Sequence, residues 1–262
     1  MHINGKPATV EDLAALTLYG YGSFTSLVVA AGRVRGLDLH LQRLQHDAAT
    51  LFGAGFDEQQ VRQWLREATV DATGPVSARI TLFQSDFNMT RPVDGPPDVL
   101  ITTRPAPSAQ PTPMRVATAE FARDVPKVKH TGLFSQLYHR RAAQARGFDN
   151  VLFLDSEDRV SEGATWNIAF VTSDGEIRWP QADMLPGVTM RLLQTVLPER
   201  GYRVTTAPVP RAGMRVLSHA FATNAVAGIR PIVAIDAQNF ALKRQVEEAL
   251  RACWMSIPTD EI

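Results

Sequence analysis

The chain is poor in lysine, so few of its side chains could act as an amine nucleophile. Its 27 basic residues comprise four lysines and 23 arginines. The lysines are Lys6, Lys127, Lys129 and Lys243. Chemistry that needs an amine to attack a carbonyl group therefore has few candidate residues.

Several short stretches carry side chains that could bind or transform a small molecule. They are residues 40–44 (His-Leu-Gln-Arg-Leu), 128–130 (Val-Lys-His), 161–167 (Ser-Glu-Gly-Ala-Thr-Trp-Asn), 185–189 (Leu-Pro-Gly-Val-Thr) and 223–225 (Thr-Asn-Ala). Each stretch alone also fits an ordinary structural role, such as a solvated helix arginine, a surface lysine or a turn carboxylate. Only their combination points to a shared site.

Together these stretches supply an amine, a carboxylate and donors for a phosphate. A phosphorylated pyridine aldehyde needs one amine to hold the aldehyde and an acid that faces the ring nitrogen. That carboxylate keeps the nitrogen protonated, so the ring can accept electron density from a carbanion. An arginine and the free N–H groups at a helix start suit the phosphate, and Gly187 would let an anion approach the backbone.

The order and spacing of the stretches resemble the class-IV aminotransferases, the fold-type IV enzymes that use pyridoxal 5'-phosphate (PLP). The resemblance runs from residue 3 to about residue 236 and covers nearly the whole chain. It implies a catalytic Lys129 that carries PLP as a Schiff base. The implied cofactor contacts are Arg43, Lys129, Glu162, Asn167, Gly187, Val188, Thr189, Thr223 and Asn224.

Within the resemblance, Arg43 binds the phosphate and Glu162 faces the ring nitrogen. Lys127 is the rival of Lys129. Lys129 is preferred because Lys-His is the family-like dipeptide and because 33 residues separate it from Glu162, which suits the pattern. Phe134 departs from the family, since transaminase members commonly place a tyrosine five residues after the lysine.

The resemblance leaves the reaction open. Residues 24–26 (Phe-Thr-Ser), the Lys129-His130 dipeptide and residues 223–232 are most similar to aminodeoxychorismate lyase, which eliminates pyruvate to give p-aminobenzoate. The resemblance alone therefore favours a lyase-like reaction. The alternative is a transaminase that acts on a branched-chain or D-amino acid or on an amine. A catalytically silent small-molecule-binding homologue is a third possibility, against which the intact Lys129 and Glu162 argue.

The order of strands and helices predicts an α+β layer, and the resemblance implies a two-domain α+β/α/β fold of the D-amino-acid aminotransferase-like kind. Residues 103–113 hold four prolines, which predicts an extended linker. We expect a smaller N-terminal α/β layer domain over residues 1–105, a Pro-rich linker over 106–113 and a larger, barrel-like PLP-binding domain over 114–262.

Local patterns predict the elements within these domains. Strands are expected at residues 23–31, 33–35, 76–83, 98–103, 150–155, 167–172, 202–206 and 219–223. Leu41, Leu44, Ala48 and Leu51 recur at helical spacing, and Gly53 closes that helix. Further helices are expected at residues 58–68, 133–146, 187–200 and 240–255.

Composition excludes several classes of function. Lys+Arg and Asp+Glu are both 27, so there is no electrostatic case for a nucleic-acid partner. Cys253 is the only cysteine, which rules out an intrachain disulfide and a multi-cysteine zinc site, and no metal is expected. No signal peptide or bilayer-length apolar run is found, so we expect a cytoplasmic protein without a membrane partner. The resemblance adds a small-molecule amino substrate and a homodimer.

Overall fold

The computed structural model describes residues 1–108 and 110–262, and it divides into two compact units. Unit 1 comprises Met1–Ser108, Val128–Gly132 and Pro258–Ile262. Unit 2 comprises Ala109–Lys127 and Leu133–Ile257. The predicted linker at 106–113 contains residue 109, which lies outside the described residues. Within the described part of the chain, no helix combines the length and apolar character needed to cross a bilayer.

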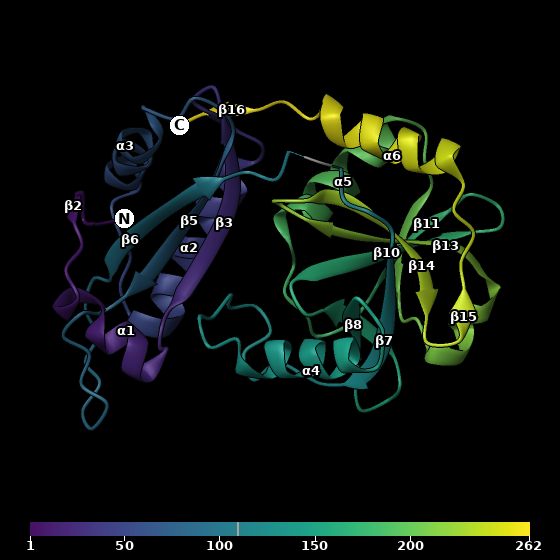
Figure 1. Ribbon diagram of the computed structural model, residues 1–262, viewed down its shortest axis with the longest axis horizontal. Helices are drawn as coiled ribbons and strands as arrows, with labels where there is room; N and C mark the ends of the chain where they lie inside the picture. The colour runs from purple at the N-terminus through teal and green to yellow at the C-terminus, as the bar shows by residue number, and fades with distance from the viewer. Residues whose placement is uncertain (109) are drawn as a thin grey trace. The chain divides into compact units, whose positions relative to one another are not determined.

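Unit 1 is a seven-stranded sheet with helices packed on it (Figure 1). The strand order is β16-β4-β3-β5-β6-β1-β2. The strands are β1 (His2–Ile3), β2 (Lys6–Pro7), β3 (Ser23–Ala30), β4 (Arg33–Val34), β5 (Val76–Phe83), β6 (Asp98–Pro105) and β16 (Asp260–Glu261). The short helix α1 (Ala14–Tyr19) precedes β3, and α2 (Leu37–Phe52) and α3 (Glu58–Thr69) lie between β4 and β5 in sequence.

Helix α2 forms because its apolar residues recur on one side. Leu37, Leu41, Leu44 and Ala48 are at most 1% exposed and pack against the buried residues of β3 and β5. The helix ends at Gly53, whose φ of 62° is a left-handed conformation that glycine adopts without strain. This agrees with the helix predicted from the leucine spacing.

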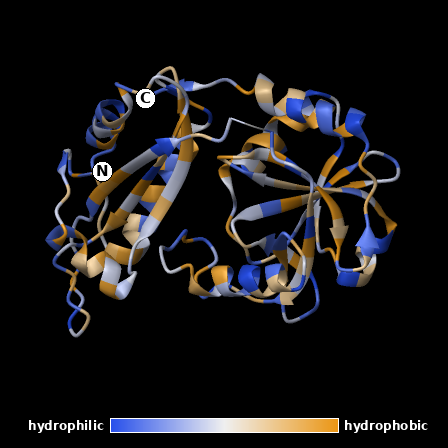
Figure 2. Ribbon diagram, in the orientation of Figure 1, coloured by the Kyte–Doolittle hydropathy of each residue, from blue (hydrophilic) through white to orange (hydrophobic). Residues whose placement is uncertain are grey.

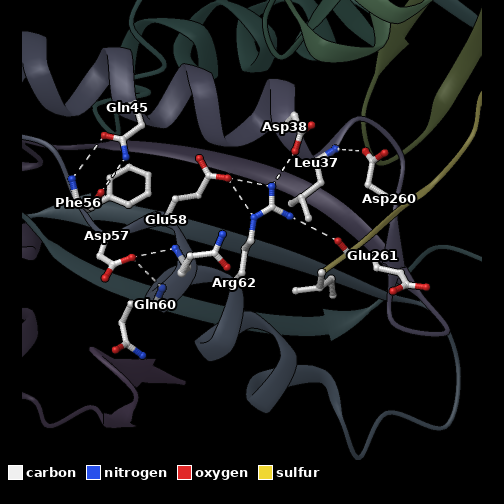
Figure 3. A network of polar contacts seen from close by, with 12 residues as sticks. Leu37, Asp38, Gln45, Phe56, Asp57, Glu58, Gln60, Arg62, Asp260 and Glu261 are labelled. Atoms are coloured by element: carbon white, nitrogen blue, oxygen red, sulfur yellow. Dashed lines mark hydrogen bonds and ion pairs between the residues drawn. The ribbon is translucent and has the colours of Figure 1, made fainter.

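The last five residues complete unit 1. Strand β16 pairs with β4, and Asp260 accepts a hydrogen bond from the Leu37 backbone N–H at the start of α2 (2.9 Å; Figure 3). Arg62 on α3 forms ion pairs with Glu58 and with Asp38 on α2. The C-terminal segment and both helices are therefore joined by one polar network (Figure 3).

Unit 2 contains a nine-stranded sheet in which six strands close a barrel. Successive pairings run β10-β13-β14-β7-β8-β9, and β9 pairs back to β10. The barrel strands are β7 (Met114–Glu120), β8 (Asn150–Leu154), β9 (Val160–Gly163), β10 (Trp166–Thr172), β13 (Leu217–Asn224) and β14 (Gly228–Ile235). The sheet extends through β11 (Ile177–Pro180) and β12 (Val204–Ala207), and β15 (Gln238–Asn239) pairs with β14. The barrel confirms the predicted fold class.

Three helices cover the barrel of unit 2 (Figure 1). They are α4 (Phe134–Ala145), α5 (Val188–Glu199) and α6 (Arg244–Ser256). Helices α5 and α6 bury Leu193, Leu197 and Leu250 in one apolar cluster with residues of β10 and β13. In Figure 2, α4 and α6 alternate hydrophilic and hydrophobic segments, as expected of helices that bury one face.

Helix α6 begins later than the predicted start at residue 240. Phe240 is 5% exposed and belongs to the barrel core, and its backbone N–H bonds the carbonyl of Val233 on β14. That tertiary contact holds Phe240 extended, so the helix begins only at Arg244.

Candidate functional site

Lys129 is held by the start of strand β3 within unit 1. The Phe24 backbone N–H donates to the Lys129 carbonyl (2.9 Å), and Thr131 N–H donates to the Gly22 carbonyl (2.8 Å). Ser23 and His130 form an antiparallel bridge between these two bonds. The Lys129 Nζ lies 4.6 Å from the centroid of the Phe24 ring, a favourable cation–π position. Lys129 is half-buried, whereas its rival Lys127 is exposed.

Helix α2 presents a polar stripe beside its leucine face. His40, Arg43 and Asp47 follow at spacings of three and four residues and so lie on one side of the helix. Asp47 Oδ2 accepts a hydrogen bond from the Lys129 backbone N–H (3.2 Å). Arg43 and His40 both contact Thr25 on β3. We call Thr25, His40, Arg43, Asp47 and Lys129 the lysine group.

Thr25 links Arg43 to His40 through one hydroxyl. Arg43 Nη2 donates to Thr25 Oγ1 (2.5 Å), because a guanidinium can only donate. The Thr25 hydroxyl is then able to donate to His40 Nδ1, which lies 2.6 Å away. This requires a neutral imidazole whose proton is on Nε2. Thr25 and His40 therefore orient the Arg43 guanidinium.

Burial shifts two members of the lysine group in opposite directions. Burial lowers the pKa of His40 well below its ordinary value, and the charges of Arg43 and Lys129 lower it further. This agrees with the neutral imidazole that the Thr25 contact requires. Burial raises the pKa of Asp47 to about 6, against the opposing effects of the Lys129 backbone bond and the charges of Arg43, His46 and Lys129.

Three of the predicted contacts stand side by side in the barrel of unit 2. Asn167 on β10 is the registered partner of Glu162 on β9 and of Thr223 on β13. All three are 3–4% exposed. Adjacent strands lie about 4.8 Å apart, so these residues form one row across the sheet. The pairing of β10 with both neighbours brings together positions up to 61 residues apart in sequence.

Glu162 forms a buried ion pair with Arg123. Arg123 Nε donates to Glu162 Oε1 (2.5 Å) and Arg123 Nη2 donates to Oε2 (3.4 Å). Arg123 lies in the loop after β7 and is 8% exposed. The fork of two donors fixes the orientation of the carboxylate.

Asn167 fixes the loop that leads into α5. Its Nδ2 donates to the Leu185 carbonyl (2.8 Å), and its Oδ1 accepts from the Gly187 backbone N–H (3.1 Å). A Cβ at Gly187 would come within 2.1 Å of Asn167 Oδ1, so only glycine fits there. The row of three strand residues is thus tied to the start of the helix.

The start of α5 can receive an anion. No side chain of the described residues caps this end, and the N–H groups of Val188 and Thr189 lie in the first turn, where helices lack internal partners. The Thr189 hydroxyl is buried and has no hydrogen-bond partner among the described residues. The same is true of Arg123 Nη1. Buried hydrogen-bond donors that lack a partner among the described residues lie here beside a helix start and a carboxylate. This combination fits a ligand that carries a phosphate and a basic ring nitrogen, as PLP does.

Asn224 shapes the turn that follows strand β13. Its Oδ1 accepts from the backbone N–H groups of Val226 (3.0 Å) and Ala227 (2.7 Å), which closes the turn between β13 and β14. Its side-chain oxygen therefore shapes the turn beside Thr223. We call Arg123, Glu162, Asn167, Gly187, Thr189 and Thr223 the glutamate group.

The predicted site residues thus fall into two groups, each built within one unit. The lysine group holds Lys129 and Arg43, and the glutamate group holds the other predicted contacts apart from Val188 and Asn224, which adjoin it. The sequence did not single out Arg123 or Asp47. Asp47 could have been noticed, because it follows His40 and Arg43 on one helical face, but no local pattern marks Arg123.

Comparison with known proteins identifies the family. The model of the family "Amino-transferase class IV" matches residues 22–235. A branched-chain-amino-acid aminotransferase of Pseudomonas aeruginosa is 26% identical over 153 residues, which cover 55% of this chain and 50% of that protein. The chain spans about half the length, or less, of the curated relatives it matches.

Solved structures share the fold across almost the whole chain. The branched-chain amino acid aminotransferase of Escherichia coli has a TM-score of 0.84 at 21% identity, over 97% of this chain and 92% of its own. The fold IV transaminase CpuTA1 of Curtobacterium pusillum has a TM-score of 0.77 at 25% identity, over 96% and 91%. The chain belongs to the class IV aminotransferase family, whose members are PLP-dependent enzymes.

Proposed function

We propose that the protein is a PLP-dependent transaminase in which Lys129 is the cofactor lysine. The observation that supports the cofactor site most is the row of Glu162, Asn167 and Thr223 beside the start of α5. The matched relatives carry aminotransferase names, which supports the transaminase alternative over the lyase favoured from motif detail.

Bound PLP would supply an electron sink for negative charge that develops beside the transferred amino group. The Lys129 amine moves the proton at the substrate carbon as general base and acid. Glu162 would hold the proton on the ring nitrogen of the bound cofactor, and Arg123 keeps that carboxylate oriented. Lys129, Glu162 and Arg123 are each held by contacts within their own unit.

Each of the two groups, taken by itself, offers donors that suit a phosphate. Arg43 offers a guanidinium that Thr25 orients, and α5 offers the N–H groups of Val188 and Thr189 with the Thr189 hydroxyl. Charge-assisted bonds of this kind are about twice as strong as neutral ones. The turn at residues 223–224 adds the third phosphate contact.

Arg79 favours an amino acid over a simple amine as substrate. It lies on β5 with its guanidinium carbon 3.6 Å from the centroid of the Phe24 ring, the ring that also contacts Lys129. Burial lowers the pKa of Arg79, and no carboxylate forms an ion pair with it among the described residues. A half-buried guanidinium near the amine would pair with the carboxylate of an amino or keto acid. The branched-chain names of the relatives suggest the side-chain class.

Absorption spectroscopy of the cofactor-loaded protein tests the proposal. An amino donor alone (L-leucine, L-glutamate or D-alanine) should bleach the band of the lysine-bound cofactor, and a keto acid should restore it. An unchanged band, together with release of p-aminobenzoate and pyruvate from aminodeoxychorismate, would reinstate the lyase. Protein that stays colourless after incubation with PLP and dialysis would favour a silent binding homologue. The expected homodimer is a separate prediction, which sedimentation of the loaded protein checks.

A further inference from the structure

Asp47 is an unusual residue for the interior of unit 1. It is 0% exposed and lies on helix α2, on the side that also carries His40 and Arg43. One oxygen accepts the Lys129 backbone N–H, and the other, Oδ1, is buried without a hydrogen-bond partner among the described residues. Burial of a carboxylate costs stability unless it is compensated. Because burial of the Asp47 carboxylate costs stability, we expect this residue to have a role in the site.

We propose that Asp47 is a positioning residue that fixes the backbone of Lys129 against helix α2. The inference rests on the proposed function, in which Lys129 is the cofactor lysine. Both backbone polar groups of Lys129 are occupied. Its carbonyl accepts from Phe24 on β3 (2.9 Å), and its N–H donates to Asp47 (3.2 Å). The residue is thus clamped between a strand and a helix.

Through this clamp, helix α2 holds both the Lys129 backbone and Arg43, the proposed phosphate-binding arginine. Arg43 precedes Asp47 by one turn on the same face of α2. In PLP the aldehyde and the phosphate are joined by covalent bonds, so the groups that hold them must keep a fixed spacing. Small misplacement of reacting groups slows a reaction strongly. Asp47 sets that spacing by joining the Lys129 backbone to the helix that carries Arg43.

The proposed role requires that position 47 carry an oxygen that accepts the Lys129 N–H. The competing explanation is that the negative charge of Asp47 is what matters. The charged and titratable groups that face Asp47 are Arg43 and His46 on α2 and Lys129 on the segment against β3. An asparagine at position 47 keeps an oxygen that can accept the Lys129 N–H and removes the charge. A leucine has nearly the same size and removes both. The two substitutions therefore separate hydrogen bonding from charge.

The test measures how fast Lys129 captures the cofactor. Unsubstituted protein, Asp47→Asn and Asp47→Leu are mixed with PLP or with pyridoxal, samples are reduced with borohydride over time, and peptides are mapped. Capture joins the lysine nitrogen to the aldehyde carbon with loss of water, and borohydride reduces the new C=N bond to a secondary amine. Asp38→Ala is the matched control, since Asp38 lies on the same helix but pairs with Arg62 at the surface (Figure 3).

We expect Asp47→Leu to slow capture about tenfold, the effect of an unsatisfied buried N–H. The slowing should be equal for PLP and pyridoxal, because Asp47 acts through Lys129 and not through the phosphate. Asp47→Asn should stay within about twofold of the unsubstituted protein, as should Asp38→Ala. Thermal melts of the cofactor-free proteins show whether each variant is folded. If Asp47→Leu is not, Asp47→Ala replaces it with the same expectation.

If a folded variant without the acceptor oxygen (Asp47→Leu or Asp47→Ala) captures the cofactor at the normal rate, the proposed role of Asp47 is overturned. Equal slowing of Asp47→Asn and Asp47→Leu also overturns it, because charge rather than the acceptor would then be responsible. Label on a residue other than Lys129 in the unsubstituted protein is a different failure. It overturns the proposed function itself, and the role of Asp47 with it.

Discussion

Arg123 and Glu162 meet in a buried, two-pronged ion pair, with Nε 2.5 Å from Oε1 and Nη2 3.4 Å from Oε2. Their side chains are only 3% and 5% exposed. The pair gives the Glu162 carboxylate one orientation before any ligand is present. A polar group that is positioned in advance needs no reorganisation during a reaction.

Loss of Arg123 should strongly destabilise unit 2. Arg123→Gln leaves the Glu162 carboxylate buried without its counter-charge, and breaking such a pair costs about 3–5 kcal/mol. Urea unfolding of the cofactor-free protein, followed by circular dichroism, measures the free energy. Arg203→Gln is the control, because Arg203 pairs with Asp174 at the surface of the same unit and should matter little. The double variant Arg123→Met/Glu162→Gln should recover part of the loss. If Arg123→Gln and Arg203→Gln cost the same, the pair does not act as described.

Glu162→Gln should bind PLP but turn over slowly. The neutral amide keeps the size of the side chain and cannot hold a proton on the ring nitrogen. The proposed proton-holding role predicts a fall in kcat on the order of 100-fold. Absorbance titration measures PLP affinity, and steady-state kinetics with saturating PLP measures kcat. Near-normal turnover would remove the proposed role of Glu162.

Local sequence patterns predicted those elements of the fold whose residues carry their own signal. The leucine spacing gave α2, and the strand-forming stretches gave β3 and β5. The strands β7, β9 and β14 were missed. Strand β9 has only four residues, Val160–Gly163, and all four are buried, so it shows no alternation of apolar and polar positions. Its strand character comes from pairing with β8 and β10.

The candidate site, too, was predicted from sequence only where its residues belong to a motif. Arg43, Lys129 and Glu162 were proposed from a resemblance of ordered motifs, and the registered row of Glu162, Asn167 and Thr223 follows from pairings that no local pattern specifies. Arg123 could not be found from sequence, because it lies 39 residues from Glu162 in a loop without periodicity. Tertiary closure of the barrel creates that contact.

Arg43→Ala should weaken binding of PLP far more than binding of pyridoxal. Only PLP presents a dianionic phosphate, and a lost hydrogen bond between charged groups corresponds to about 10- to 100-fold in affinity. Equilibrium dialysis against each ligand gives the two ratios. Arg62→Ala is the control, since Arg62 belongs to the surface network of α2 and α3 (Figure 3). An equal loss for both ligands would instead make Arg43 a structural arginine.

The stability of the cofactor-free protein should respond to the titration of Asp47. Burial raises the pKa of Asp47 from 3.8 to about 6, so between these values the folded state binds more protons at this site than the unfolded state does. The stability contributed by Asp47 is therefore fully present below pH 3.8 and is lost as the pH rises through 6. The shift corresponds to up to about 3 kcal/mol.

Asp47→Asn removes this titration, so its advantage in stability over the unsubstituted protein should be largest above pH 6 and shrink toward pH 4. Urea unfolding of both proteins at matched pH measures the difference. His40 pulls the other way, because burial lowers its pKa and the unfolded state then binds more protons below the ordinary value of a histidine. Both proteins carry His40, so its effect cancels in the difference. A difference that does not change between pH 7.5 and 4.5 would mean that folding does not raise the pKa of Asp47, which contradicts its burial as a carboxylate.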